Sequence, residues 1–239
     1  MQQALPVALS SQVALQRRLD TLADNLANAT TPGHLATNVR FEAALARNGG
    51  AGVSFVSHGG EVLDSRRGAM IETGGALDFA VRGEAWLGIE TPAGTVLTRD
   101  GRTRMDPDGT LRTLEGHAVL DPGGGPVRLD PDGGPVIATA DGTLLQGGRQ
   151  TGRIGLFETD APPRTRWSNS GVIPSGVPRP VVDRTDVGLV QGHIEGSNVN
   201  AVEQMVRLIE VTRGFETVAG LAQRADGTLN EAFRTLAGR

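Results

Sequence analysis

Apolar residues recur at steps of three and four near both ends of the chain. Toward the C-terminus they form a seam of Leu208, Val211, Phe215, Val218, Ala222, Ala225, Leu229, Ala232 and Leu236. Toward the N-terminus the same spacing joins Ala8, Leu15, Leu19, Leu22, Leu26 and Ala29, with Gln12 as the single polar member. This period is typical of a helix that packs along another helix. We therefore predict one helix over residues 5–29 and another from about residue 200 to 236.

The boundaries of both helices are marked in the sequence. Pro6 suits a first helical turn, whereas Pro32 cannot continue a helix. Asn200, with Glu203 three residues later, has the spacing of a capping box at the start of the second helix. At 1.5 Å per residue the helices would be ~37 Å and ~55 Å long. The first can therefore cover only part of the second.

The C-terminal helix carries a second apolar set on a neighbouring face, made of Val202, Met205, Val206 and Ile209. No other segment of the sequence is evidently able to pack over this apolar face. Burying one large aliphatic side chain stabilises by about 1.5–3 kcal/mol, against a typical total stability of about 5–15 kcal/mol. We therefore expect neighbouring subunits to cover this face, and the terminal helices to be poorly ordered in a single subunit.

Between the helices the hydrophobic period changes toward two, which is typical of strands. Apolar and β-branched residues cluster at 78–81, 85–91, 95–98, 111–114, 118–120, 127–129, 136–139, 153–158 and 187–194. Asp-Gly pairs, which favour tight hairpins, lie at 100–101, 108–109, 132–133 and 141–142. The fold class is therefore predicted as α+β, with a β-rich domain of short antiparallel strands over residues 61–197. Residues 1–33 and 198–239 form a discontinuous helical domain, residues 34–60 a connector, and the Pro-rich stretch 161–180 a linker or an edge segment.

Composition excludes several classes of function. The 239 residues have a net charge of -4, without the basic stripe of a nucleic-acid-binding surface. Cysteine is absent, the four histidines are far apart in sequence, and neither a nucleophile elbow nor a phosphate loop is present. Aromatic residues make up only 3%, which argues against a sugar-binding platform. We expect no catalytic, cofactor-binding or metal-binding residues and no cofactor, and we interpret Arg66–Arg67 and Arg164 with Arg166 as solvated.

The chain also lacks the signals of a membrane or secretory protein. No stretch approaches the ~20 apolar residues of a membrane-spanning helix, so no direct membrane insertion is expected. The N-terminus has an apolar stretch but no basic n-region, and its helical pattern continues through Arg17 and Arg18. If the protein leaves the cytoplasm, we expect a route that does not cleave this end.

Three long motifs resemble those of the bacterial flagellar rod and hook proteins. The N-terminal one runs from Leu19-Asp20 through Asn25-Leu26-Ala27-Asn28 to Thr31-Pro32-Gly33. The C-terminal one includes Glu195-Gly196-Ser197-Asn198-Val199-Asn200, then Met205-Val206 and Phe215-Glu216. A central run over 77–87, followed by 98–101, is similar to the family's β-domain core. Departures from the family pattern are Asp24 in place of an asparagine, and His34-Leu35 and Trp86-Leu87 in place of aromatic residues.

The resemblance implies a structural subunit of the flagellar basal-body rod, and length and local detail are most similar to the proximal rod type. Its terminal helices would form a coiled-coil inner layer, and subunits would stack helically into a torque-transmitting shaft across the periplasm. Its partners would be copies of itself, other rod proteins and the flagellar type III export apparatus, which uses an uncleaved N-terminal signal. The expected assembly interface is Leu15, Leu19, Leu22, Leu26, Val202, Met205, Val206, Leu208, Ile209, Val211, Phe215, Val218 and Leu229. The family-motif positions are Asn25, Asn28, Gly33, Ser197, Asn198 and Glu216.

Two alternatives remain at this point. A distal rod or short hook-type subunit differs in its position within the flagellum rather than in mechanism. An exported β-domain enzyme or glycan-binding module with a helical stalk belongs to another class and would need acids and aromatics clustered on one face of the β-domain.

Overall fold

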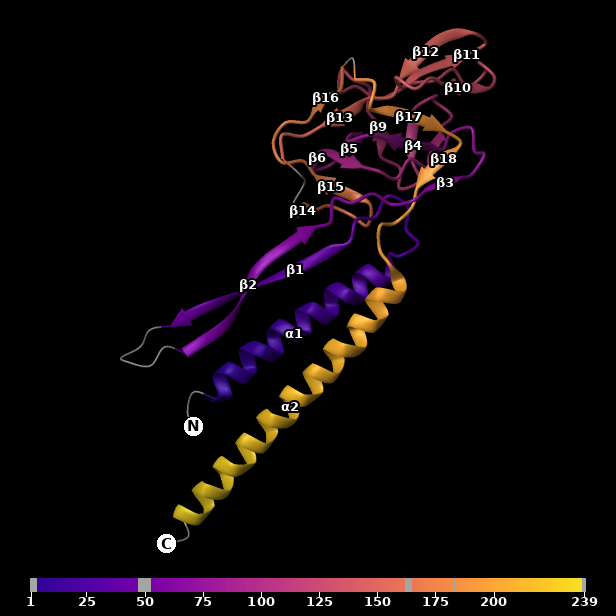
Figure 1. Cartoon of the computed structure of the whole chain (residues 1–239). Coiled ribbons are helices and arrows are strands. Elements are labelled where there is room, and N and C mark those ends of the chain that lie inside the picture. Colours follow the sequence, from indigo (N-terminus) through magenta and orange to yellow (C-terminus); the bar gives the residue numbers. More distant parts are fainter. Residues whose placement is uncertain (1–3, 47–52, 162–164, 183, 238–239) are drawn as a thin grey trace. The chain divides into compact units, whose positions relative to one another are not determined.

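The computed structural model describes residues 4–46, 53–161, 165–182 and 184–237. It confirms the α+β class, with two long helices and many short strands that pair antiparallel (Figure 1). The chain divides into two compact units. We call them the helical unit (Met1–Ala27, Thr37–Val62 and Asn200–Arg239) and the β unit (Asn28–Ala36 and Leu63–Val199).

The helical unit contains both helices and a β-hairpin. Helix α1 spans Ala4–Ala27 and helix α2 spans Ala201–Ala237, close to the expected limits. The two helices contact each other, and α1 also contacts strand β1. Strands β1 (Thr37–Ala46) and β2 (Val53–Leu63) form a two-stranded sheet within the segment expected as a connector. We expected this segment only as a connector, although residues 38–43 alternate polar and apolar side chains, which is typical of a strand.

Helix α2 begins at the asparagine that the sequence marks. The Glu203 backbone N–H donates to Asn200 Oδ1 (3.2 Å), and the Gln204 N–H donates to the Asn200 carbonyl (3.0 Å). This is an N-cap, which satisfies backbone donors that have no partner inside the helix. The Glu203 side chain instead accepts from Arg207, one turn along the helix (2.5 Å).

The β unit is built around one large antiparallel sheet. The strand order is β14-β15-β6-β5-β9-β8-β7, and β13 pairs with both β5 and β16. The bounds of its strands are β5 Trp86–Thr91, β6 Gly94–Thr98, β7 Thr103–Met105, β8 Leu111–Thr113, β9 Ala118–Val119, β13 Leu156–Glu158, β14 Thr165–Arg166, β15 Gly171–Ile173 and β16 Arg179–Pro180.

Three smaller antiparallel sheets complete the β unit. In one, β10 (Val136–Ala138) and β12 (Arg149–Arg153) flank β11 (Thr143–Gln146). In the other two, β4 (Phe79–Arg82) pairs with β17 (Gly188–Gln191), and β3 (Met70–Glu72) pairs with β18 (His193–Glu195). The last strands of the unit therefore return to pair with its first, which closes the unit on itself.

Two clusters of buried side chains hold the β unit together. The larger contains Phe79, Leu111, Leu144 and Ile154, none more than 1% exposed. The smaller joins Leu97 to Trp86, Phe157 and Leu35. Leu→Ala substitutions at sites of this kind cost about 2–5 kcal/mol, so these clusters account for much of the unit's stability.

The Asp-Gly pairs divide into two groups. Residues 108–109 connect β7 to β8 and residues 141–142 connect β10 to β11, so both lie in hairpin turns as predicted. The prediction was wrong at 100–101, because β6 and β7 do not pair with each other. There a Cβ on Gly101 would lie 1.5 Å from the Phe79 carbonyl oxygen, so glycine allows two backbone segments to approach closely. Residues 132–133 form a turn that joins no two paired strands, with the Gly133 N–H donating to the Asp130 carbonyl.

Two further segments differ from the simple expectation. Residues 127–129, expected as a strand, form an isolated bridge between Thr110 and Arg128 and backbone hydrogen bonds with Gly109, Leu111 and Val119, but no continuous strand. The Pro-rich stretch is an edge segment where it is described, since β14 is the edge strand of the large sheet and β16 pairs only with β13. No helix in the described ranges is both long and apolar enough to span a membrane.

Candidate assembly surface

The apolar seam of the helical unit is only partly covered. Leu22 on α1 and Val211 on α2 are each 6% exposed, and so lie in the interior of this unit. The remaining described seam positions are half-buried: Leu15, Leu19, Leu26, Leu208, Phe215 and Val218. The Leu229 side chain lies outside the described part of the chain. A seam of this kind can accept further packing from another molecule.

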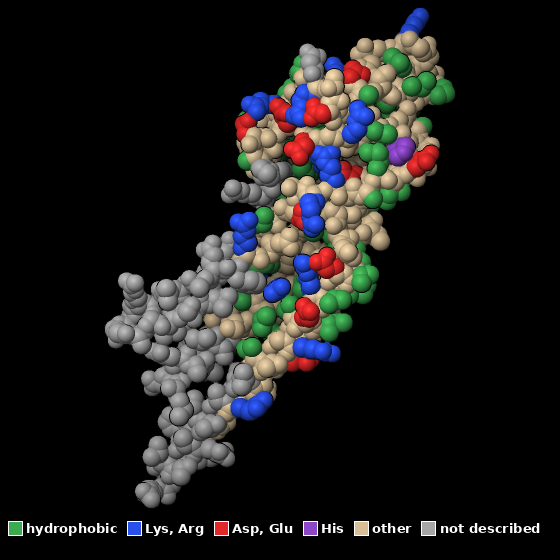
Figure 2. Space-filling model, in the orientation of Figure 1, with side chains coloured by type: hydrophobic (Ala, Val, Ile, Leu, Met, Phe, Trp, Pro, Cys, Tyr) green, Lys and Arg blue, Asp and Glu red, His purple; other side chains and the backbone are tan. Residues whose placement is uncertain are grey.

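The second apolar set on α2 is exposed along its whole length. Val202 is 70% exposed, and Met205, Val206 and Ile209 are 47%, 52% and 54% exposed. At 100° per residue these side chains point away from the face that carries Val211. Hydrophobic side chains gather along the upper half of α2 in Figure 2. Contiguous exposed apolar surface of this kind marks an interaction site more often than scattered single residues do.

Helix α1 adds two exposed apolar residues that the sequence analysis did not single out. Leu9 is 51% exposed and Val13 is 56% exposed. They are four residues apart and therefore share one face of the helix. The spacing could have identified them, but it does not distinguish a covered stripe from an open one.

Asn25, one of the family-motif residues, fixes the start of the hairpin within the helical unit. Its side chain is 1% exposed and forms two hydrogen bonds with Thr37. Asn25 Nδ2 donates to the Thr37 carbonyl and the Thr37 N–H donates to Asn25 Oδ1, both at 2.8 Å. The Asn25 amide thus pairs with the Thr37 backbone as a neighbouring strand would. Asparagine suits this position because its side chain carries both a donor and an acceptor.

Asn198 joins two passages of backbone in the β unit. Its Oδ1 accepts from the Ala36 N–H at 2.6 Å, while Nδ2 donates to the carbonyls of Asp64 (2.9 Å) and Arg66 (2.7 Å). Its own backbone N–H donates to the His34 carbonyl at 3.2 Å. One side chain therefore ties residues 34–36 to residues 64–66, two segments that the sequence separates by about thirty residues.

Gly33 and Glu195 belong to the same cluster. The Gly33 N–H donates to the Glu195 carbonyl at 2.8 Å. Gly33 has φ 69°, and a Cβ there would lie 2.3 Å from the Asp100 nitrogen, so both the backbone angle and the space require glycine. Glu195 forms an ion pair with Arg99 at 2.8 Å, and both side chains are almost fully buried. Sequence reasoning missed this ion pair, because 95 residues separate the two partners.

The other motif residues have simpler roles. Asn28 is buried and its Oδ1 accepts from the Thr31 hydroxyl at 3.1 Å. The Ser197 hydroxyl accepts from the Val199 N–H at 3.2 Å, and Glu216 is exposed on α2. The motifs therefore contain residues that shape the turns at the helix ends rather than a single reactive site.

One expectation about arginines was wrong. Arg166 is not solvated: it is half-buried, its Nη1 lies 2.7 Å from His34 Nδ1, and its Nη2 donates to the Leu35 carbonyl. His34 is fully buried and stands where the family has an aromatic residue, so a ring still fills this position. Arg66 is solvated as expected, although it also pairs with Asp64, and this hydrogen bond holds the pKa of the Asp64 carboxyl below its usual range. Arg164 lies outside the described residues.

Comparisons with known proteins agree with this architecture. The family described as "Flagella basal body rod protein" matches residues 5–34, and "Flagellar basal body rod FlgEFG protein C-terminal" matches residues 190–235. The first match covers α1 and the turn after it, and the second covers the end of the β unit and most of α2. The two matches thus contain both helices and most of the motif residues described above.

Full-length relatives are more specific. The chain is 50% identical to the flagellar basal-body rod protein FlgF of Mesorhizobium japonicum, over 99% of this chain and 98% of that protein. It is 48% identical to FlgF of Rhizobium meliloti, over 100% of this chain and 99% of that protein. Identity to the rod protein FlgG of Bacillus subtilis is 27%, over 97% of this chain and 98% of that protein. The chain therefore belongs to the FlgF family of flagellar basal-body rod proteins, and it is a structural subunit of the proximal rod rather than an enzyme.

Proposed function

We propose that this subunit stacks with copies of itself and with other rod proteins through its terminal helices. In the assembled rod, α1 and α2 pair as part of a coiled-coil inner layer, and the stacked subunits form the stiff shaft that transmits torque across the periplasm. The contact residues are the thirteen interface positions named in the sequence analysis. Leu22 and Val211 act mainly within a subunit, whereas the exposed set on α2 acts between subunits.

The exposed set of Val202, Met205, Val206 and Ile209 is the observation that carries this proposal. Each side chain leaves about half or more of its surface in water. Burial of one such side chain is worth about 1.5–3 kcal/mol, so covering all four supplies a substantial part of a subunit contact. Helix α2 is also longer than α1 by thirteen residues (37 against 24), so α1 cannot cover its whole length.

The test replaces the exposed apolar set in cells. A triple variant Val202→Ser, Val206→Ser and Ile209→Ser is expected to abolish swimming and to remove complete rods from purified basal bodies. Because the three side chains are exposed, the purified subunit should unfold at the same urea concentration as the unaltered protein. Swimming and intact rods in the triple variant would contradict the proposal.

A matched control keeps the number of serines on the same helix. Glu210→Ser, Thr212→Ser and Thr217→Ser alter exposed polar positions of α2. This control changes helix propensity by a similar small amount but leaves the apolar set of Val202, Met205, Val206 and Ile209 intact. It is expected to swim, so a defect confined to the first triple variant identifies the apolar face as the cause.

The same proposal includes export by the flagellar type III apparatus without cleavage of the N-terminus. Its support is the sequence of the first helix, in which the apolar pattern continues through Arg17 and Arg18. Mass spectrometry of the subunit from purified basal bodies should find the N-terminal peptide intact. A mature N-terminus that begins inside α1 would contradict this route.

A further inference from the structure

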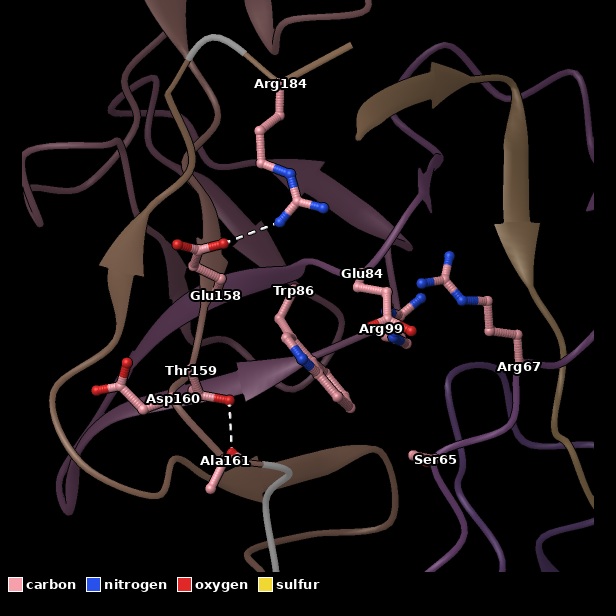
Figure 3. A pocket seen from close by; sticks show the side chains of 10 residues that line it. All are labelled: Ser65, Arg67, Glu84, Trp86, Arg99, Glu158, Thr159, Asp160, Ala161 and Arg184. Atoms are coloured by element: carbon pink, nitrogen blue, oxygen red, sulfur yellow. Dashed lines mark hydrogen bonds and ion pairs between the residues drawn. The ribbon is translucent and has the colours of Figure 1, made fainter. Parts of the chain in front are cut away.

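The charges around a pocket in the β unit are balanced within that unit. The pocket has a volume of about 320 Å³ and opens beside Trp86, with three arginines and three acidic residues in its lining (Figure 3). Arg99 pairs with Glu195 at 2.8 Å. Arg184 pairs with Glu158 at 3.0 Å. The β unit thus matches its charged groups even where its surface is hollowed.

The helical unit, in contrast, buries a side-chain atom that has no hydrogen-bond partner. Gln204 lies four and seven residues before Leu208 and Val211, so it extends the apolar seam of α2 toward the start of the helix. Gln204 is only 6% exposed. Among the described residues, its Oε1 is the one buried side-chain atom that forms no hydrogen bond. Such an atom calls for an explanation, because buried polar side chains are nearly always paired.

The packing around the start of α2 is also incomplete. The first turns of α2 lie beside the end of α1 (Figure 1), and a pocket of about 170 Å³ opens one turn after Gln204. Arg207 of α2, Leu22 of α1 and residues 37–39 of β1 are among the residues that line this pocket. Most of the apolar seam positions are half-buried as well. The contact between α1 and α2 is therefore not fully closed in a single subunit.

An unpaired amide oxygen weakens the contact that buries it. The Gln204 oxygen gives up its hydrogen bonds to water and receives none in return, so its burial opposes the pairing of α1 with α2. Polar residues at such seam positions lower the stability of paired helices and restrict which pairings form. We propose that Gln204 weakens the α1–α2 contact of a single subunit, so that the two helices can separate and repack when subunits stack. This inference rests on the proposed stacking of subunits.

The strength of the helix pair in a free subunit affects how readily that pair rearranges. Stacking can change the pairing only by as much as its contacts favour the assembled arrangement over the free one. A tighter pair in the free subunit therefore opposes repacking, and the unpaired oxygen of Gln204 reduces that opposition. The proposal predicts a variant that is more stable as a subunit but poorer in assembly. A glutamine with a purely structural role does not predict this combination.

The variant Gln204→Met tests the weakening in the purified subunit. Methionine is unbranched like glutamine and has a similar helix propensity, but it has no carbonyl oxygen to satisfy. Amides of α1 and of the first turns of α2 should exchange with deuterium about tenfold more slowly, which corresponds to about 1.4 kcal/mol. The control Gln223→Met makes the same change at an exposed position of α2 and should leave the rates unaltered. Equal rates in the two variants would overturn the proposal, because the Gln204 oxygen would then already be satisfied.

A cellular arm tests the consequence for assembly. Cells with Gln204→Met should contain fewer complete rods and swim more slowly, although the purified subunit is more stable, whereas Gln223→Met cells should match the original strain. Normal rods and swimming with Gln204→Met overturn the proposal even if its helices exchange more slowly. The stacking proposal then still stands if the serine variant of α2 fails to swim. If both variants swim normally, both proposals fail.

Discussion

The two units of this protein differ in how completely each buries its own apolar side chains and pairs its own buried charges. In the β unit two clusters of apolar residues are buried, although scattered ones such as Ile137 and Val177 are exposed, and its buried charged pair, Arg99 with Glu195, is matched at 2.8 Å. In the helical unit most described apolar side chains are half-buried or exposed, and Leu22 and Val211 are the buried large aliphatic ones among them. The β unit therefore has the features of an independently stable domain, whereas the helical unit has those of a part completed by its neighbours.

The largest effect should come from the buried ion pair of the β unit. Glu195→Leu leaves Arg99 charged and without its acid in the interior, which costs about 3–5 kcal/mol. Urea unfolding followed by tryptophan fluorescence measures this loss. Glu203→Gln in α2 breaks an exposed pair with Arg207 and should cost at most about 1 kcal/mol. Similar losses in the two variants would contradict the contrast between the units.

Hydrogen exchange should show the same contrast without any substitution. In a dilute subunit, amides of α1 and α2 should exchange much faster than those of β5, β6 and β9, because few buried contacts hold the helices. Mass spectrometry of peptides from each element measures these rates. Assembly into rods should then slow exchange in the helices. Strong protection of both helices in a dilute monomer would show that they are complete without neighbours.

A buried leucine of the β unit and an exposed isoleucine of α2 offer a direct comparison, with a smaller expected effect on stability. Leu111→Ala in the β unit should cost about 2–5 kcal/mol, since the side chain is fully buried. Ile209→Ala on α2 should change the stability of a single subunit by about 0.5 kcal/mol or less, since its side chain is 54% exposed. Urea midpoints of the two variants provide the measurement. A large loss for Ile209→Ala would mean that the stripe is covered within one subunit.

The smallest effect concerns acid stability of the β unit. Hydrogen bonds from Thr139 and Thr143 lower the pKa of Asp141. The ionised carboxylate therefore stabilises the fold at pH values above the usual aspartate pKa, and this stabilisation is lost as the pH falls below about 4. Because Asp141 is largely exposed, Asp141→Asn should cost only a few tenths of a kcal/mol at pH 7. The difference should vanish near pH 2 in parallel thermal melts. A constant difference across this range would contradict the assignment.

Much of the fold is readable from the sequence, because it is encoded in local periodicity. The step of three and four residues located both helices to within a few residues, and the Asn200 cap marked the start of α2. Alternation and turn residues indicated an all-β middle. The motifs indicated the family, which the full-length relatives then confirmed.

The rest depended on contacts between residues far apart in the chain. Partners such as Arg99 with Glu195, or Asn198 with Ala36 and Asp64, leave no periodic trace, because their spacing is set by the path of the backbone. For the same reason the sequence could not distinguish Gly101, which allows a close approach, from Gly109, which lies in a hairpin turn. Periodicity identifies which side chains share a helix face, but only the folded structure shows that the face of Val211 is covered and the face of Ile209 is open, since coverage depends on what packs there.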